Sequence, residues 1–330
     1  MIKIIKKIIF ILVIFFMYFS FVLFQGNSIK EKKIFNIESG QGVNEISNNL
    51  FKDGLINNKF ILETYLWFIE SEEKVKAGRY IFEPNISMFN LVKLILDTPR
   101  ESQMSVTLLE GWDRILIGKE LESNGLSSTI FLDLTKEKLN YVSQFSFLKD
   151  LPNKESLEGY IFPDTYYINV KTDENDFILK TLKNFDKKLD LSLREEIKKQ
   201  NKSIFEIITL ASIIEREVPN NEDKKMIADI FLKRLSIGMA LQSDATINFI
   251  TGKGMTQPTY DDLEVDSLYN TYKYPGLPPG PISNPGLDSI KAVIYPESNN
   301  YYFFLTSKDG KVIYSTTYEE HLQNKYKYLN

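Results

Sequence analysis

An unbroken apolar run opens this chain, ahead of the alternating apolar and polar positions that fill the rest of it. The run extends from Ile8 to Phe24 and follows three lysines near the N-terminus. It contains no charged residue, and with Ile4 and Ile5 it approaches the roughly 20 residues that a helix needs to span a bilayer. The pattern therefore predicts a membrane-spanning helix over residues 8–25.

A cleavable signal peptide is the alternative explanation of this run. Such peptides end at small residues, and the segment from Phe21 to Gly26 has no such site. We therefore expect an uncleaved signal-anchor with residues 1–7 in the cytoplasm, following the positive-inside rule. The lysines within residues 30–33 reduce the charge difference on which this orientation rests. After a polar linker over 26–34, the remaining chain is then extracytoplasmic, held at the cell (inner) membrane by a single pass.

Beyond the linker, period-two apolar runs alternate with runs at helical spacing. A strand and turn are expected at 35–40, followed by a helix at 43–51. A second strand is expected at 78–82, followed by a helix at 87–96. A third strand and helix are expected within 105–123. Such small strand–helix units resemble LysM-type glycan-binding modules, and a plain α+β scaffold explains the pattern equally well. The prediction is an α+β protein: a LysM-like α/β subdomain over 35–104 and a mixed α+β domain over 105–330.

The helix from Ser203 to Pro219 is the centre of the second predicted domain. Ser203 and Glu206 form a capping box at its start, and proline ends it. Glu215 continues the apolar stripe of this helix, whereas Glu217 lies off the stripe. A carboxyl group at the end of an apolar stripe is costly to ionise, so its pKa is expected to be raised, as a general acid requires. A structural ion pair with a nearby Arg or Lys is the commoner explanation of such a residue.

The remaining elements have recognisable ends. Helices are expected at 173–188, at 192–200 behind a Ser192 cap, at 220–237 and at 287–294; a hairpin is expected over 301–315 and a final helix after Thr317. Five prolines and three glycines between Tyr274 and Gly286 predict a rigid loop of the kind that carries binding groups. The segment Ser156–Tyr166 sets Glu158 and Tyr160 among aromatic residues. Aromatic faces beside acids suit sugar rings, although an ordinary packed corner is more frequent.

Composition narrows the possible functions. The 330 residues carry a net charge of −4, which argues against a nucleic-acid-binding protein. The absence of cysteine excludes disulfides, thiolate metal sites and a cysteine nucleophile. His321 is the only histidine, so a zinc enzyme or a Ser-His-Asp hydrolase is not expected.

Five segments together resemble one family, the endolytic murein transglycosylases of the YceG-like group. In chain order they are LEGYIFPDTY (157–166), LASIIERE (210–217), FLKRLSIGMALQSDATI (231–247), YNTYKYPGLPPGPISNPG (269–286) and YEEH (318–321). The resemblance covers most of the chain beyond the apolar run and is strongest from residue 156 onward.

The resemblance implies a bitopic membrane protein with a LysM-like subdomain ahead of its catalytic domain. It implies a lyase that cleaves nascent peptidoglycan between N-acetylmuramic acid and N-acetylglucosamine, leaves a 1,6-anhydromuramic end and so ends glycan elongation. Glu215 matches the catalytic glutamate of the family motif, and no metal or other cofactor is implied. Penicillin-binding proteins or other wall synthases are the implied partners.

The family likeness also suggests residues that hold the sugar. Tyr269 and Asn270 would bind it near Glu215, and Gln242 would lie on the neighbouring wall; Glu158 and Tyr160 complete the candidate set. Hydrogen bonds that fix loops are the alternative role for Gln242, Tyr269 and Asn270.

Two other functions stay open at this point. A membrane-anchored peptidoglycan-binding protein without catalysis could recruit wall synthases, and a hydrolase could cleave the same bond with water. A Glu215 tied to Arg216 or Lys224 at the surface would favour the binding protein, and the mass of the product would separate a lyase from a hydrolase.

Overall fold

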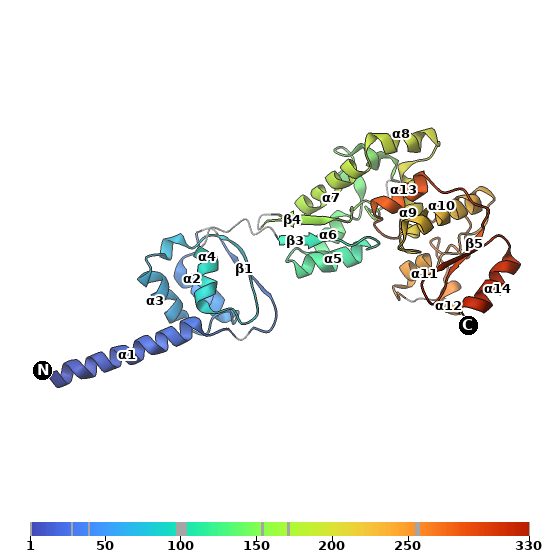
Figure 1. The fold of residues 1–330 in the computed structure, drawn as a ribbon. Helices are drawn as coiled ribbons and strands as arrows, with labels where there is room; N and C mark the ends of the chain where they lie inside the picture. Colours follow the sequence, from blue (N-terminus) through green and yellow to red (C-terminus); the bar gives the residue numbers. More distant parts are fainter. Residues whose placement is uncertain are drawn as a thin grey trace. The chain divides into compact units, whose positions relative to one another are not determined.

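The computed structural model describes residues 2–27, 29–38, 40–96, 104–152, 155–169, 172–254 and 258–329. The chain divides into two compact units. The first unit comprises Met1–Met104 and Tyr167–Thr172, and the second comprises Ser105–Tyr166 and Asp173–Asn330 (Figure 1). Residues 97–103 of the expected 35–104 subdomain lie outside the described residues.

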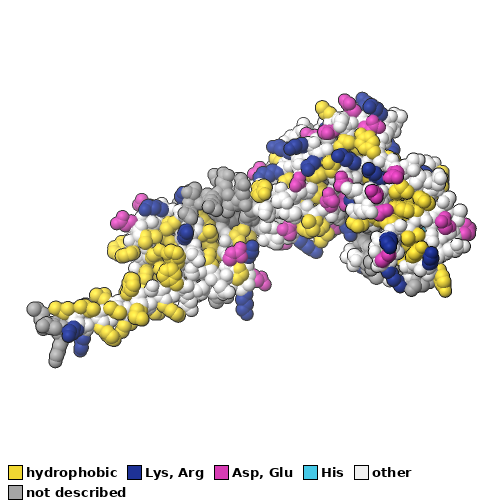
Figure 2. Space-filling model, in the orientation of Figure 1, with side chains coloured by type: hydrophobic (Ala, Val, Ile, Leu, Met, Phe, Trp, Pro, Cys, Tyr) yellow, Lys and Arg dark blue, Asp and Glu magenta, His cyan; other side chains and the backbone are white. Residues whose placement is uncertain are grey.

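The apolar run forms helix α1, Ile2–Phe24, which begins earlier than the sequence suggested. Residues Ile4–Phe24 are long and apolar enough to cross a membrane, and a signal sequence near an N-terminus has the same properties. Beyond the lysines near its start, α1 exposes hydrophobic side chains over much of its surface (Figure 2).

The rest of the first unit is a small α+β fold. Its elements are β1 (Lys33–Ile37), α2 (Val43–Lys52), α3 (Lys59–Phe68), the 3-10 turn η1 (Glu72–Lys74), β2 (Gly78–Phe82) and α4 (Met88–Leu96). The two strands pair antiparallel, with Lys33 opposite Phe82 and Ile37 opposite Gly78. Both strands and helices α2 and α4 were expected from the sequence. Helix α3 was missed, although Asn58 caps it by accepting from the N–H groups of Phe60 and Ile61.

The second part of the chain is mainly helical. Its elements are β3 (Met104–Thr107), α5 (Arg114–Ser123), α6 (Ser128–Leu134), η2 (Lys138–Asn140), η3 (Ser146–Asp150), β4 (Thr165–Ile168), α7 (Glu174–Lys188), α8 (Leu191–Lys199), α9 (Ile204–Ile214), α10 (Asn221–Ser236), α11 (Asp244–Thr251), α12 (Tyr260–Leu263), α13 (Leu287–Ile294), β5 (Phe303–Thr306), β6 (Val312–Ser315) and α14 (Tyr318–Leu329). Strand β3 pairs with β4, and β5 pairs with β6. Helix α9 contacts α8, α10 and α13.

Helix α9 is predominantly apolar, and every residue from Ile207 to Ile214 is buried. The capping box of Ser203 and Glu206 is present, as the sequence predicts. The helix ends at Ile214, however, and not next to Pro219. The N–H groups of Arg216 and Glu217 bond to carbonyls only three residues back, so the chain tightens into turns before the proline.

The start of α8 also corrects a sequence expectation. Asp190, and not Ser192, is the N-cap residue, because its carboxylate accepts from the N–H of Leu193 at 3.0 Å. The Ser192 hydroxyl instead donates to Asp190 at 2.6 Å. A carboxylate and a hydroxyl two residues apart are both good caps, so the sequence alone did not distinguish them.

The loop rich in proline and glycine is fixed by hydrogen bonds to α9 and to the segment after β3. The N–H of Ile282 donates to the hydroxyl of Ser212 at 3.0 Å. Asn284 exchanges backbone hydrogen bonds with Gly111 and Trp112, at 2.9 and 2.8 Å. These contacts place the start of α13 beside the end of α9.

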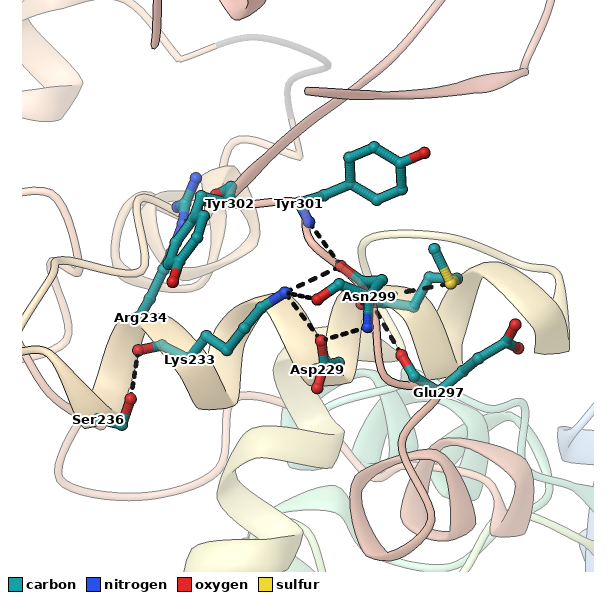
Figure 3. A network of polar contacts seen from close by, with 9 residues as sticks. Asp229, Lys233, Arg234, Ser236, Glu297, Asn299, Tyr301 and Tyr302 are labelled. Carbon is teal, nitrogen blue, oxygen red and sulfur yellow. Dashed lines mark hydrogen bonds and ion pairs between the residues drawn. The ribbon is translucent and has the colours of Figure 1, made fainter. Parts of the chain in front are cut away.

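Another polar network attaches the segment before β5 to α10 (Figure 3). Lys233 pairs with Asp229 at 2.9 Å and donates to the carbonyl of Asn299 at 2.6 Å, and the N–H of Asn299 donates to Asp229 at 3.0 Å. The guanidinium of Arg234 donates to the carbonyl of Tyr302 at 2.7 Å. The terminal hairpin and α14 are thereby connected to the core of the second unit.

Replacing Gly159 with alanine is expected to destabilise the second unit. Gly159 has a φ of +87°, and a Cβ there would lie 2.7 Å from Pro281 and 2.8 Å from Ile208. Backbone strain of about 1–2 kcal/mol and overpacking of about 1–3 kcal/mol should add. Gly238→Ala is the matched control, because Gly238 has a φ of +69° with no heavy atom within 4 Å of the added Cβ. Equal thermal midpoints for the two variants would contradict the packing argument.

Candidate active site

The carboxylate of Glu215 lies at the C-terminal end of α9 and is held by three hydrogen-bond donors. One oxygen, Oε1, lies 2.8 Å from the ammonium of Lys224. The other, Oε2, accepts from the N–H of Gly286 at 2.9 Å and from the hydroxyl of Ser289 at 2.7 Å. The side chains of Glu215 and Lys224 are only 6% and 3% exposed. The structural ion pair that the sequence left open is therefore present, but it is buried and not at the surface.

Three helix ends build this arrangement. Glu215 is the C-cap residue of α9, and the turn through Pro219 leads to Asn220, which caps α10 by accepting from its first N–H groups. Lys224 then follows on α10, close to the end of α9. Gly286 is the N-cap residue of α13, so its N–H belongs to a helix N-terminus, where free donors suit a negative charge.

A second carboxyl group, that of Glu110, lies against the same helix N-terminus. A Cβ built on Gly286 would fall 1.8 Å from Oε1 of Glu110, so any larger residue at position 286 would displace the carboxyl group of Glu110. Burial, with the charge of Glu215 as the next cause, raises the pKa of Glu110. The sequence analysis did not select Glu110, and its one signal was a position next to Gly111 in the turn after a strand.

Glu158 is buried and supports the loop around Asn284. Its carboxylate accepts from the N–H of Arg114 at 3.0 Å and from the side-chain amide of Asn284 at 2.8 Å. Burial raises its pKa to about 7, against the lowering effect of these contacts with Arg114. Since Asn284 lies two residues before Gly286, Glu158 helps to position the loop that carries a donor to Glu215.

Tyr160 and Asn270 are both fully buried. The ring of Tyr160 packs between Phe147 and Phe185, and its hydroxyl has no hydrogen-bond partner within the described part of the chain. The amide of Asn270 donates to the carbonyls of Leu263 and Val265 at 2.8 and 2.9 Å. Side chains without exposed surface do not reach a glycan in this conformation, so the geometry favours packing for Tyr160 and loop fixing for Asn270.

Gln242 and Tyr269 retain accessible surface. Gln242 is exposed and has a φ of +52°, which is unusual for a residue other than glycine, and its N–H donates to the carbonyl of Thr271 at 3.0 Å. The half-buried ring of Tyr269 lies 5.1 Å from that of Phe249. The structure therefore brings Gln242 next to the segment 269–271, as a shared wall would require. No described contact joins either side chain to Glu215.

Glu217 is a half-buried acid that lies off the apolar stripe expected from the sequence. Its carboxylate accepts from the hydroxyl of Ser243, at the start of α11. Burial raises its pKa to about 7; the hydrogen bond from Ser243 lowers it and the charge of Asp244 raises it. The tightened turn after Ile214 redirects this side chain inward, which a regular helix would not have done.

The two acids with a pKa of about 7 predict a pH-dependent stability. Glu158 and Glu217 have an ordinary pKa of 4.5, so between pH 4.5 and about 7 the folded chain holds protons that the unfolded chain has lost. The stabilisation that these two groups contribute to the folded state should therefore be complete below pH 4.5 and decrease as the pH rises to about 7. Glu217→Gln keeps an acceptor for Ser243 and cannot titrate. Its thermal midpoint should fall less than that of the parent over this range, and parallel curves would refute the assignment.

Comparisons with known proteins agree with the segments found in the sequence. The profile of the YceG-like family matches residues 35–327. The chain belongs to the YceG-like family. The match includes every residue of the candidate site and begins after α1.

Named relatives and a solved structure extend this membership. The endolytic murein transglycosylase of Bacillus subtilis is 30% identical over 306 residues, which cover 89% of this chain and 84% of the relative. The endolytic murein transglycosylase of Streptococcus pneumoniae strain R6 is 34% identical, and the match spans 89% of this chain and 58% of that protein. The crystal structure of a YceG-like protein from Listeria monocytogenes superposes with a TM-score of 0.62 at 33% identity, covering 89% of this chain and 99% of that one.

Proposed function

We propose that this chain is a membrane-anchored endolytic peptidoglycan lytic transglycosylase in which Glu215 is the acid and base. The names of the relatives support the reaction class. The observation that carries the proposal is the buried carboxylate of Glu215, fixed by Lys224, Gly286 and Ser289 where three helix ends meet. A side chain that only capped a helix would not need three donors from two other helices.

The reaction requires one carboxyl group in two states. Protonated Glu215 would donate to the glycosidic oxygen as the bond to the anomeric carbon of the muramic residue breaks. The resulting carboxylate would take the proton of the C6 hydroxyl of the same sugar, whose oxygen attacks the anomeric carbon and closes the 1,6-anhydro ring. The nucleophile is intramolecular, which gives a large proximity advantage. No water is consumed, and the proton balance returns Glu215 to its acid form.

The contacts of Glu215 suit the second half of this cycle. All three partners donate hydrogens to the carboxylate, so they orient it as a proton acceptor. Before bond cleavage Glu215 would carry a proton on Oε1 or Oε2, and the hydrogen bond from one of these donors to that oxygen would be lost. Lys224 and Ser289 are side chains that can rotate away, whereas the N–H of Gly286 is fixed in the backbone. We infer that Lys224 and Ser289 are positioning residues for the carboxyl group.

Helix α1 would anchor the enzyme, with the chain after Phe24 outside the cytoplasm. The first unit, a two-stranded antiparallel sheet flanked by helices with its own core, supports a LysM-like glycan-binding role. Wall synthases are the partners that a nascent-strand enzyme would meet. The pneumococcal match spans 58% of that relative, and the rest of that relative lies outside the match.

The product decides the reaction type. Purified glycan strands are digested with the full chain in detergent, and the new ends are read by mass spectrometry. Ends that lack one water relative to a hydrolysed end are expected. Ends that contain the added water would make the protein a hydrolase, and intact strands that still bind the folded chain would make it a binding protein.

A further inference from the structure

The last turns of α1 are part of the core of the first unit. Val22 and Leu23 are 7% and 6% exposed, whereas Phe16 of the same helix is 71% exposed. The ring of Phe19 lies 6.5 Å from that of Tyr65 on α3, and the ring of Phe24 lies 5.1 Å from that of Phe89 on α4. The helix that resembles a membrane span therefore continues directly into a folded unit.

The chain after α1 is attached to this unit without a free spacer. Gly26 forms a bridge to Ser87, and the N–H of Asn27 donates to the carbonyl of Ile86 at 3.0 Å. A Cβ on Gly26 would lie 2.7 Å from the carbonyl oxygen of Asn85, so the two segments touch at their backbones. The sequence had suggested a linker over 26–34, and its first residues are instead built into the fold.

In the proposed function α1 spans a bilayer. Its attachment to the folded unit then determines how deeply α3 lies in that bilayer. The span Ile4–Phe24 has 21 residues, which at 1.5 Å each is about as long as the 30 Å hydrocarbon core is thick. Phe24 then lies near the outer boundary of the core, and Phe19 lies about 7.5 Å deeper. Tyr65 contacts Phe19, so α3 lies at the depth where interfacial helices bury their apolar faces, about 5–10 Å.

The exposed face of α3 is aromatic, as is typical of helices at a membrane interface. Phe60, Trp67 and Phe68 are 61%, 66% and 75% exposed, and the opposite face, with Leu62 and Leu66, is buried. Phe60 and Trp67 are seven residues apart, which places them on one side of the helix. Figure 2 shows hydrophobic side chains continuing from α1 over the region of α3. Tryptophan and other aromatic residues are enriched at membrane interfaces, and a water-exposed patch of this kind is unfavourable.

We propose that the exposed face of α3, formed by Phe60, Trp67 and Phe68, inserts into the interface of the bilayer that α1 crosses. The part of the first unit that follows α1 then lies on the outer surface of the membrane. The occupant of this face is lipid, because the same helix that enters the bilayer holds α3 beside it. The inference rests on the anchoring part of the proposed function.

The absence of cysteine allows a direct test by spin labelling. Phe68→Cys of the full chain is labelled and reconstituted into vesicles of phosphatidylethanolamine and phosphatidylglycerol. The accessibility of the label to oxygen, which concentrates in lipid, is compared with its accessibility to a water-soluble nickel complex. Tyr260→Cys, at an 89% exposed aromatic position of the second unit, is the matched control. Because both positions are exposed, neither substitution disturbs a core.

The expected result is an oxygen-to-nickel accessibility ratio several-fold higher at position 68 than at position 260. Equal ratios would overturn the proposal, and a label shielded from both reagents would overturn it by showing that protein, such as a second copy of the chain, covers this face. Flotation of the vesicles distinguishes a failure of membrane anchoring from a failure of α3 insertion. If the chain does not float with the lipid, the anchoring itself fails; if it floats and the ratios are equal, only the insertion of α3 fails.

Discussion

Glu215→Gln is expected to remove strand cleavage, with the rate lowered about 10²–10⁴-fold, as for the loss of a general acid and base. Glutamine has the size of glutamate and can still accept from Gly286 and Ser289, but it can neither deliver nor remove a proton. The fold should survive with a smaller loss of stability than Lys224→Met causes, because the side-chain carbonyl of glutamine can still accept from the buried ammonium of Lys224. The release of anhydro ends from glycan strands measures the effect, and circular dichroism verifies the fold.

Glu222→Gln is the control for this variant. Glu222 lies in the first turn of α10 and is exposed, so the same change of charge near the site leaves the carboxyl group of Glu215 in place. Its cleavage rate should stay close to that of the parent. A Glu215→Gln protein that retains the parent rate would transfer the acid role to another residue, and Glu110, against Gly286, would be the first to examine.

Lys224→Met is expected to cause the largest loss of stability. The Lys224 side chain is 3% exposed and pairs with Glu215 at 2.8 Å, so its removal leaves a buried carboxylate without its cation. Breaking one side of a buried ion pair costs about 3–5 kcal/mol. For a unit of this size that corresponds to a fall in thermal midpoint of about 6–20 °C. Differential scanning calorimetry of the full chain in detergent measures it.

Two further variants isolate the buried charge as the cause. Lys224→Met combined with Glu215→Gln should recover much of the loss, because no unpaired charge then remains. Lys199→Met removes a lysine that is 73% exposed and pairs with Glu196 at 3.6 Å, so its effect should stay within about 1 kcal/mol. A double variant as unstable as Lys224→Met alone would mean that the packing of the lysine stem, and not its charge, stabilises the unit.

Local signals in the sequence were sufficient for much of the fold. The capping box of α9, the bounds of α13 and the hairpin of β5 and β6 follow from cap residues, proline, glycine and apolar periodicity. These features depend on residues within a few positions of each other. Glu215 was found in the same way, because a carboxyl group at the end of an apolar stripe is visible in one helix.

Of the three partners of Glu215, the sequence suggested only Lys224, as an alternative to Arg216. Gly286 and Ser289 look like a loop glycine and a helix serine, and they acquire their roles only when α9 and α13 pack together. Glu217 was misjudged because a regular helix would have pointed it away from the core, whereas the turn after Ile214 brings it to Ser243. Tyr160 is the reverse case, since an aromatic residue beside an acid is a buried core side chain in the structure, which the sequence could not show.

The hydrogen bonds to Glu215 also set an order of events during synthesis. Gly286 and Ser289 lie 71 and 74 residues after Glu215 along the chain. A protein that emerges from its N-terminus onward therefore displays α9 well before α13 exists to orient the carboxyl group. Until Gly286 and Ser289 have been synthesised, the growing chain holds Glu215 without two of its three hydrogen-bond donors, so a product truncated before Gly286 should be unable to cut the cell wall.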